Sequence, residues 1–251
     1  MKTLDPLGDG LSAVTLTRVD GSDLDTVNSA RVSFDGFSER MTERDERLVA
    51  YLARHHHTSP FRHAHVQLRV KAPISIARQL YKHVVGIETL EFDGVTLQHV
   101  TPDGAFKDHG YNEVSYRYVQ AEPEFYVPAP GQWRVQAATN RQASVADEAR
   151  ELPQEALTAR TREQVGRDYA FYRDLLACGV AREQARNYLP LALYTEWVWT
   201  LTLQAVLHCI ALRDHEGAQW EARQYGRAMA ELIGPHFPVA LREWRSGRGT
   251  A

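Results

Sequence analysis

The chain has 251 residues, of which 43% are hydrophobic and 24% charged, with a formal net charge of −3. This composition is typical of a folded globular protein and excludes disordered and collagen-like chains. Only two cysteines, Cys178 and Cys209, are present, which excludes a disulfide framework and favours a reducing compartment. The slightly acidic balance argues against RNA binding as the main function. We expect a single domain over residues 1–251.

No segment has the pattern of a targeting or membrane-spanning sequence. The first residues, MKTLDPLGDG, lack the apolar core of a signal peptide, so we expect a cytoplasmic protein. The most apolar window, 188–212, contains Pro190, Glu196, Gln204 and His208. These residues favour a buried strand and a buried helix over a membrane span.

The first third of the chain predicts a strand followed by capped helices. Weak alternation indicates a strand over 12–19, and Ser22 begins a helix that extends to about residue 32. Thr42 and Asp45 have the spacing of a helix cap. The apolar stripe expected on that second helix comprises Leu48, Tyr51 and Leu52. A loop is expected over 55–61, because Pro60 disfavours helical geometry at Ser59.

Strict alternation over 63–71 predicts a half-buried strand. Its inward residues are Ala64, Val66, Leu68 and Val70, and its outward residues are His63, His65, Gln67, Arg69 and Lys71. Pro73 then begins a helix over 74–84. Two polar rows run along this helix, Arg78 with Lys82 and Gln79 with His83.

The rest of the chain continues to alternate between strands and helices. Asp93-Gly94 predicts a β-hairpin over 90–100. A long helix is expected over 153–177, ended by Gly179, with Val165, Tyr169, Tyr172 and Leu176 facing inward. Further expected elements are a short helix over 182–189, a strand over 191–199, a buried helix over 201–212 and an amphipathic helix over 218–232. These elements indicate a mixed α/β or α+β domain.

The histidines raise the alternative of a zinc-dependent hydrolase. His55, His56, His57, His63 and His65 lie close together in the sequence, and an HxH pair on a strand face could hold zinc. There is no HExxH motif, so hydrogen bonding or loop packing is the competing interpretation, and we favour no metal site.

Arginine is the residue type best suited here to bind phosphate, because no glycine-rich phosphate loop is present. The candidates are Arg78, Arg117, Arg186 and Arg213. Each could instead pair with an acidic residue, and Arg213 could cap the end of its helix. Glu113 and Ser115 could be a base and a nucleophile, but without a histidine partner we interpret Ser115 as a hydrogen-bonding residue.

Several blocks of this sequence resemble the flavin-dependent thymidylate synthases. They are SARVSF at 29–34, HTSPFRH at 57–63, KAPISIARQLYKH at 71–83, NEVSYRYV at 112–119, EFY at 124–126, AREQARNYLPLALYTEWVWT at 181–200 and LRDHEGAQWEARQY at 212–225. The resemblance implies an α+β fold with a mixed sheet and flanking helices. It also implies a homotetramer whose FAD and nucleotide sites lie between subunits.

The reaction that the resemblance implies is reductive methylation of uracil at C5. Methylenetetrahydrofolate donates the carbon, and NADPH reduces the FAD that supplies the hydride. Because C5 is a poor nucleophile, a fixed cation must stabilise negative charge on the ring. Arg213 matches the family arginine beside the uracil. Neither cysteine lies in the Pro-Cys setting of the cysteine-dependent synthases, which agrees with electrostatic activation.

The resemblance also assigns roles to individual residues. The implied catalytic residues are Arg213 and His57, the latter acting on flavin and folate orientation. The implied nucleotide contacts are Gln79, Lys82, Glu113, Ser115, Arg117, Arg186 and Arg213. The implied flavin contacts are His57, Ser59, Lys82, His83, Glu113, Thr202, Gln204 and His208.

The sequence departs from the family pattern at three places. The family signature has Arg-His-Arg followed by Ser, whereas this chain has Lys82-His83-Val84 and a longer segment before Ser115. Thr202 and His208 replace two family asparagines. The extra residues, about 86–108, contain the predicted hairpin. Our hypothesis is that these changes admit a ribose 2′-hydroxyl, so that UMP as well as dUMP is methylated, as in UMP methylases of nucleoside-antibiotic pathways. The alternative is a strict dUMP-to-dTMP synthase.

Overall fold

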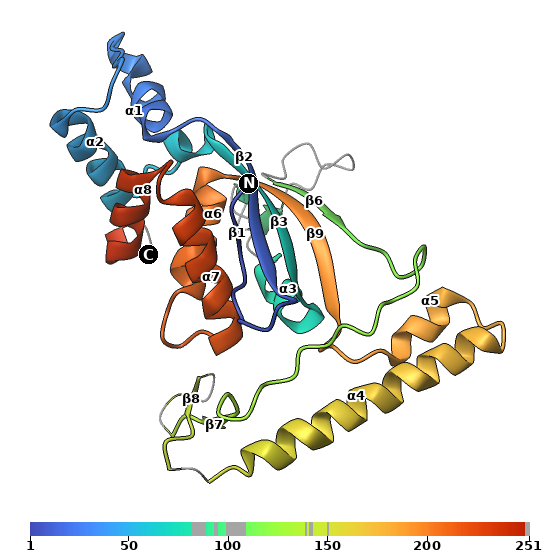
Figure 1. Cartoon of the computed structure of the whole chain (residues 1–251). Coiled ribbons are helices and arrows are strands. Elements are labelled where there is room, and N and C mark those ends of the chain that lie inside the picture. The colour runs from blue at the N-terminus through green and yellow to red at the C-terminus, as the bar shows by residue number, and fades with distance from the viewer. Residues whose placement is uncertain are drawn as a thin grey trace.

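The computed structural model describes residues 1–81, 89–92, 95–98, 109–138, 140, 143–149 and 151–248. The sheet strands are β1 (Thr3–Leu4), β2 (Ala13–Asp20), β3 (His65–Pro73), β9 (Tyr194–Thr202) and β6 (His109–Glu113), adjacent in that order. Figure 1 shows this sheet with helices against it. The α+β class is confirmed. The sheet differs from the implied mixed sheet, because every pairing among its described strands is antiparallel.

The alternation predicted for β3 is confirmed. Val66, Leu68 and Val70 are buried, whereas Arg69 on the opposite face is exposed. Arg69 forms an ion pair at 2.7 Å with Glu196 of β9, the neighbouring strand. The strand begins at His65, two residues later than predicted, because the preceding chain forms the 3₁₀ helix η2 (Ser59–Arg62) and not an irregular loop.

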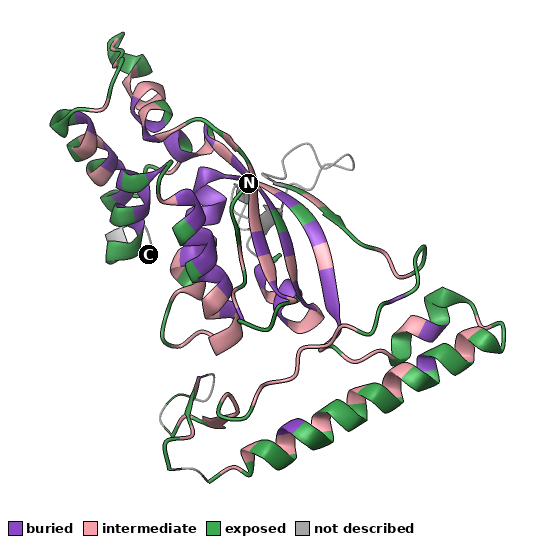
Figure 2. Cartoon of the chain, viewed as in Figure 1, coloured by how far each residue is buried: buried purple, intermediate pink, exposed green. Residues whose placement is uncertain are grey.

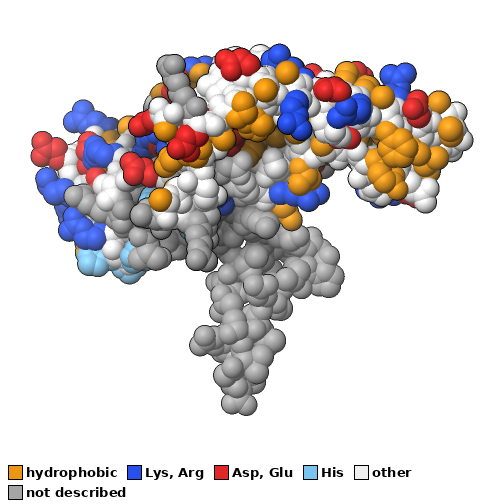
Figure 3. Space-filling model, turned by 90° about the horizontal axis from the view of Figure 1, so that it is seen from below, with side chains coloured by type: hydrophobic (Ala, Val, Ile, Leu, Met, Phe, Trp, Pro, Cys, Tyr) orange, Lys and Arg blue, Asp and Glu red, His pale blue; other side chains and the backbone are white. Residues whose placement is uncertain are grey.

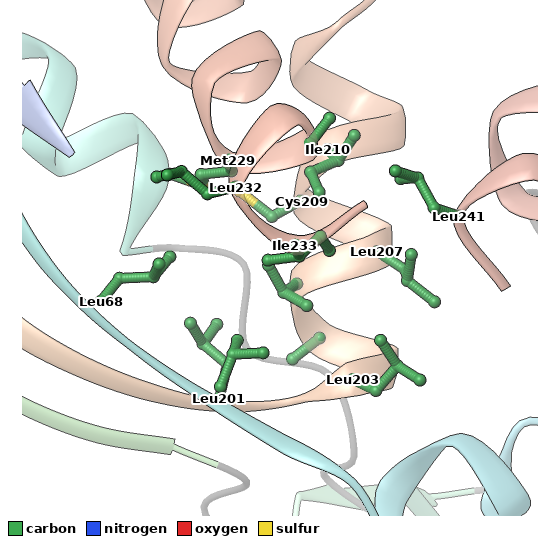
Figure 4. Close-up of a cluster of buried hydrophobic side chains, with 14 of the residues drawn as sticks. Leu68, Leu201, Leu203, Leu207, Cys209, Ile210, Met229, Leu232, Ile233 and Leu241 are labelled. Atoms are coloured by element: carbon green, nitrogen blue, oxygen red, sulfur yellow. The ribbon is translucent and has the colours of Figure 1, made fainter. Parts of the chain in front are cut away.

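Two helices cover one face of the sheet and form the main core (Figure 2). They are α6 (Leu203–Arg213) and α7 (Trp220–Ile233). Figure 4 shows Leu201 of the sheet close to Ile233 of α7, with Leu68 of the sheet and Leu207 of α6 on opposite sides of the same cluster. Each such side chain contributes about 1.5–3 kcal/mol when fully buried. The buried helix predicted for 201–212 is therefore confirmed, with a start two residues later.

Gly226 permits α7 to approach the end of α6 closely. A Cβ atom at this position would lie 3.1 Å from the Cβ of Arg213 and 3.1 Å from the backbone nitrogen of Asp214. These contacts are tighter than most real Cβ contacts, so an alanine at 226 would require Arg213 and Asp214 to shift by a few tenths of an ångström.

Helices α1 (Asp23–Arg31) and α2 (Glu43–Arg54) begin where predicted, because Ser22 and Thr42 each form a capping box with the acidic residue three positions on. The apolar stripe predicted for α2 is wrong at Tyr51, which is 52% exposed. The buried apolar residues of α2 are Val49, Leu52 and Ala53, because α8 (Pro238–Glu243) packs against that side of the helix.

Asp45 also joins α2 to the segment after α1. Its buried carboxylate lies 2.5 Å from Nη2 of Arg31 and accepts hydrogen bonds from the hydroxyls of Thr42 and Ser38. Burial raises the pKa of Asp45, but these hydrogen bonds and the charge of Arg31 outweigh burial, and the pKa lies below its usual value.

The long helix α4 (Gln154–Ala177) lies apart from the sheet, as Figure 1 shows, and most of its surface is exposed (Figure 2). Of the four residues predicted to face inward, only Tyr172 is fully buried. It packs with Ala121, Ala185 and Leu193 in a second, smaller core beside α5 (Arg182–Ala185). The predicted end at Gly179 is confirmed by its φ of +83°.

The predicted hairpin is present as β4 (Thr89–Phe92) paired with β5 (Val95–Gln98), and its turn, Asp93-Gly94, lies outside the described residues. The predictions missed α8, β1, β6 and the pair β7 (Arg134–Gln136) with β8 (Ser144–Ala146). The helix expected over 74–84 is α3 (Ile74–Leu80), and residues 82–84 lie outside the described part. None of the described helices has the length and apolarity needed to cross a membrane.

Asp23 connects two helices that are distant in the sequence. It is the first residue of α1, and its buried carboxylate accepts hydrogen bonds from the backbone nitrogens of Val239 at 2.7 Å and Ala240 at 3.1 Å. These N–H groups belong to the first turn of α8, where no intrahelical acceptor is available, so Asp23 caps α8 from another part of the chain. Burial raises the pKa of Asp23, although the two hydrogen bonds oppose it.

We expect Asp23→Ala to lower the free energy of unfolding by about 1–3 kcal/mol, because two buried N–H groups lose their acceptor. Urea unfolding followed by circular dichroism measures the change. Asp20→Ala, at an exposed position of β2, is the matched control and should change stability by less than about 0.5 kcal/mol. Equal losses in the two variants would contradict the capping role.

Candidate active site

A cavity of about 670 Å³ opens where the end of β6 meets α3 and the 3₁₀ helix η3 (Arg186–Tyr188). Its lining residues are Ile74, Ala77, Arg78, Tyr81, Tyr111, Glu113, Val114, Ser115, Tyr116, Arg186, Asn187, Leu189, Leu191 and Leu193. Two backbone hydrogen bonds fix one wall, from Ile74 to Leu193 at 2.9 Å and from Ser75 to Leu191 at 3.1 Å. The fold therefore joins segments that lie far apart in the sequence.

Glu113 has a carboxylate held by two neighbouring hydroxyls. Thr195 of β9 donates a hydrogen bond to Oε1 at 2.6 Å, and Tyr111 donates one to Oε2 at 3.1 Å. Burial, with the adjacent charge of Glu113, raises the pKa of Tyr111 far above its ordinary value, so this phenol remains a donor. The carboxylate orientation is thus set before any ligand binds.

Ser115 lies in the same cavity, but its hydroxyl is not directed to Glu113. The hydroxyl oxygen accepts a hydrogen bond from the backbone nitrogen of Arg117 at 3.4 Å, and the Ser115 carbonyl accepts from Tyr118 and Val119. This turn is consistent with a hydrogen-bonding role for Ser115.

The four candidate arginines lie in different surroundings. Arg78 and Arg186 line the cavity, and within the described part of the chain neither has a carboxylate within ion-pair distance. Arg117 is outside the lining, 4.0 Å from Glu183 and 5.8 Å from the centre of the Tyr118 ring. Arg186, Glu113 and Ser115 therefore line one cavity, whereas Arg117, although its backbone nitrogen contacts Ser115, is not among the lining residues.

Arg213 is the last residue of α6, and it reaches the helix that forms one wall of the cavity. Its Nη2 donates to the backbone oxygen of Gln79 at 3.4 Å, and the Gln79 side chain donates to Gln219. The neighbouring Asp214 carboxylate is bound to Arg227 and Arg245. Arg213 and Gln79 thus form a pair beside the cavity.

The residues assigned to the flavin lie toward the other end of β9. Thr202 caps α6 by accepting from the nitrogen of Ala205 at 3.2 Å, and the buried Gln204 accepts from Nε of Arg62 at 2.7 Å. Glu113 is paired with Trp197, and the strand from there to Thr202 spans about 17 Å. Within a single chain, most of the implied flavin contacts therefore lie away from the cavity.

The remaining assigned residues are His57, Ser59, His208, Lys82 and His83. His57 and Ser59 are exposed, and the His57 ring lies 6.1 Å from that of Tyr51. His208 is half-buried on α6, and burial, then the charge of Arg213, lowers its pKa. Lys82 and His83 lie outside the described residues.

The structure gives the zinc alternative no geometric support. In the described ranges, which include 55–65, no three histidine, cysteine or acidic side chains gather around a position that could hold a metal ion. His55 instead packs against the Tyr51 ring at 4.3 Å.

Sequence reasoning missed the aromatic residues of the cavity and the partner of Glu113. The ring centres of Tyr81 and Tyr111 lie 5.7 Å apart, and those of Tyr111 and Trp197 lie 5.8 Å apart. Tyr81 follows Arg78 by three positions, a helical spacing that could have indicated a shared face. No sequence signal joins Thr195 to Glu113, because that contact depends on strand register.

The fold and the cavity are those of an α+β enzyme whose arginines and tyrosines suit an anionic, aromatic ligand. Residues 15–239 match the family model described as Thy1, thymidylate synthase complementing protein. A flavin-dependent thymidylate synthase of Thermus thermophilus is 40% identical over 220 residues, covering 88% of this chain and 70% of the relative. The flavin-dependent thymidylate synthase of Thermotoga neapolitana is 35% identical over 228 residues, covering 90% of this chain and 87% of the relative.

Solved structures agree with the sequence relatives. The UMP/dUMP methylase PolB from Streptomyces cacaoi, bound with 5-Br dUMP, superposes with a TM-score of 0.75 at 25% identity and covers 95% of this chain and 97% of that one. A second PolB structure, bound with 5-Br UMP, gives a TM-score of 0.73. The chain therefore belongs to the flavin-dependent thymidylate synthase family, and it is an enzyme of that type.

We expect Thr195→Val to lower the free energy of unfolding by about 1 kcal/mol, because the buried hydroxyl and its hydrogen bond to Glu113 are lost while side-chain shape is kept. Urea unfolding measures the change. Thr15→Val is the control, because it removes a hydrogen bond between the hydroxyls of Thr15 and Thr3 that is exposed to solvent. A loss no greater than that of the control would show that the contact contributes nothing.

Proposed function

We propose that this protein methylates uridylate at C5, with methylenetetrahydrofolate as carbon donor and NADPH as reductant. The observation that carries the proposal is the cavity with Glu113, Ser115 and Arg186, adjoining the Arg213–Gln79 pair. The relatives named flavin-dependent thymidylate synthase and the structure of a UMP/dUMP methylase support the same chemistry. FAD, when bound, supplies the hydride that completes the methyl group.

Within this proposal Arg213 stabilises the electron-rich form of the uracil ring. A guanidinium is a planar cation, so it can stabilise negative charge that develops on the ring. Its contact with the Gln79 carbonyl fixes its position before substrate arrives. The positive charge is therefore held beside the cavity in a defined place.

The nucleotide contacts of the proposal are Gln79, Lys82, Glu113, Ser115, Arg117, Arg186 and Arg213. Ser115 and Arg186 would bind the phosphate, and Glu113 would accept a hydrogen bond in the orientation that Thr195 and Tyr111 impose. Arg117 would have to leave Glu183 to take part, which a pair 4.0 Å apart and exposed on both sides permits at little cost.

The flavin contacts of the proposal are His57, Ser59, Lys82, His83, Glu113, Thr202, Gln204 and His208. The described members fit an FAD site chemically, since they offer imidazole, hydroxyl, amide and carboxylate groups. In one chain, however, most of them lie toward the opposite end of β9 from Glu113. We therefore propose a homotetramer in which neighbouring subunits complete each site.

Exposed apolar surface supports this assembly. Phe171 of α4 is 49% exposed and Tyr188 of η3 is 58% exposed, with their rings 5.4 Å apart. Figure 3 shows hydrophobic side chains gathered at one end of the described surface. Contiguous apolar patches of this kind commonly mark protein interfaces. We also propose that residues 1–251 act as one cytoplasmic domain.

Substrate choice is tested by comparing turnover on dUMP and UMP, anaerobically, with the purified yellow protein, NADPH and methylenetetrahydrofolate. We expect methylation of both nucleotides, because Lys82-His83-Val84 and the 86–108 segment depart from the family pattern. Turnover of dUMP alone would establish the alternative of a strict thymidylate synthase. A preparation that stays colourless when offered FAD would contradict the flavoprotein assignment itself.

For Arg213→Ala we expect kcat to fall by at least about 100-fold, because the charge that stabilises the ring is lost. Arg213→Lys should recover part of the rate, since it keeps the charge but not the planar fork. Arg173→Ala on the exposed side of α4 is the control. Binding of dUMP, measured by calorimetry, should weaken less than kcat falls. An unchanged kcat in Arg213→Ala would contradict the proposed role.

A further inference from the structure

We propose that Arg78 is a further substrate-binding residue, whose guanidinium binds the phosphate group of the nucleotide. The inference rests on the proposed function, because it assumes that the cavity holds the uridylate. Neither the family pattern used above nor the names of the relatives assign a role to this residue. It is identified by its position and by the lack of an acidic partner among the described residues.

Positive charge predominates among the side chains that line the cavity. Arg78 and Arg186 line it from α3 and η3, and in the described part of the chain no carboxylate lies within 4.0 Å of either guanidinium. Glu113, the lining residue with a carboxylate, is engaged by Thr195 and Tyr111. Two such guanidinium groups around one cavity favour a doubly charged anion such as a phosphate monoester.

The helix turn that carries Arg78 is preorganised by hydrogen bonds. The nitrogens of Ile74 and Ser75 are bonded to the segment 191–193, which holds the start of α3. Next to Arg78, the Gln79 carbonyl accepts from Arg213 and the Gln79 amide donates to Gln219. The backbone under Arg78 is therefore fixed on both sides, and only the side chain must order when phosphate binds.

Arg78 lines the cavity, whereas Arg117 does not. Arg117, which the resemblance places on the phosphate, lies outside the cavity lining, near Glu183. Val84 removes a further cation of the family signature. Arg78 lines the cavity directly, so it supplies the positive charge that these two positions do not provide in this structure.

The matching phosphate chemistry could come from two sources, the monophosphate of the uridylate or the diphosphate of FAD. The geometry favours the monophosphate, because Ser115 and Arg186 line the same cavity, whereas Thr202, at the end of β9, and Gln204, in α6, are not among its lining residues. The test therefore titrates dUMP into the flavin-loaded enzyme and, separately, FAD into the flavin-free enzyme, for the wild type and each variant.

Calorimetry on the flavin-loaded enzyme compares dUMP with deoxyuridine, which lacks the phosphate. We expect Arg78→Ala to weaken dUMP binding by about 10–100-fold, the effect of losing a charged hydrogen-bond donor, and to leave deoxyuridine binding unchanged. The dUMP affinity of Arg78→Lys should lie between those of the wild type and Arg78→Ala, because a lysine keeps the charge but cannot make a bidentate contact. Arg173→Ala, an exposed arginine of α4 outside the cavity, is the matched control and should bind dUMP normally.

Three results would overturn the inference. They are unchanged dUMP binding in Arg78→Ala, an equal loss for deoxyuridine, and a loss confined to FAD, which would assign the residue to the diphosphate. Because Arg78 is exposed, Arg78→Ala should unfold at the same urea concentration as the wild type. Failure of the proposed function is distinguishable, since a wild type that binds dUMP but does not methylate it would leave the binding comparison intact.

Discussion

The arrangement of the site depends on the position of β9 between β3 and β6. Its register places Thr195 beside the end of β6, where the hydroxyl meets Glu113, and its last residue, Thr202, caps the helix that follows. Because α6 turns back over the sheet, Arg213 returns to α3 beside the cavity. Strand β9 and helix α6 therefore determine together where the Glu113 carboxylate, the Thr202 cap and the Arg213 side chain lie.

The acidic groups near the cavity are engaged by partners other than the two arginines that line it. Glu113 is held by hydroxyls, Asp214 by Arg227 and Arg245, and Arg69 by Glu196 on the neighbouring strand. Among the described residues, the two arginines that line the cavity have no carboxylate at ion-pair distance. A protein with a net charge of −3 can thus present a locally positive pocket.

Local patterns in the sequence predicted the elements that local interactions determine. The capping boxes at Ser22 and Thr42, the alternation of β3 and the end of α4 at Gly179 all depend on residues close in the chain. The α8 cap could not be predicted, because its acceptor, Asp23, lies at the other end of the sequence. The exposure of Tyr51 likewise depends on where α8 packs.

The lining of the cavity could be anticipated only in part, for the same reason. The resemblance supplied Glu113, Ser115 and Arg186, which the fold brings into one cavity, but it placed Arg117 with them and did not indicate Thr195. Contacts across strands and between distant helices decide these positions, and a single sequence does not encode them in any local pattern.

The close approach at Gly226 couples the end of α6 to the backbone of α7. A methyl group at this position would lie 3.1 Å from the Arg213 Cβ, so a larger residue would displace the end of α6, which carries Arg213, by a few tenths of an ångström. Under the proposed role of Arg213, the reactivity of the pyrimidine would then be adjustable from α7, by a residue that has no functional group.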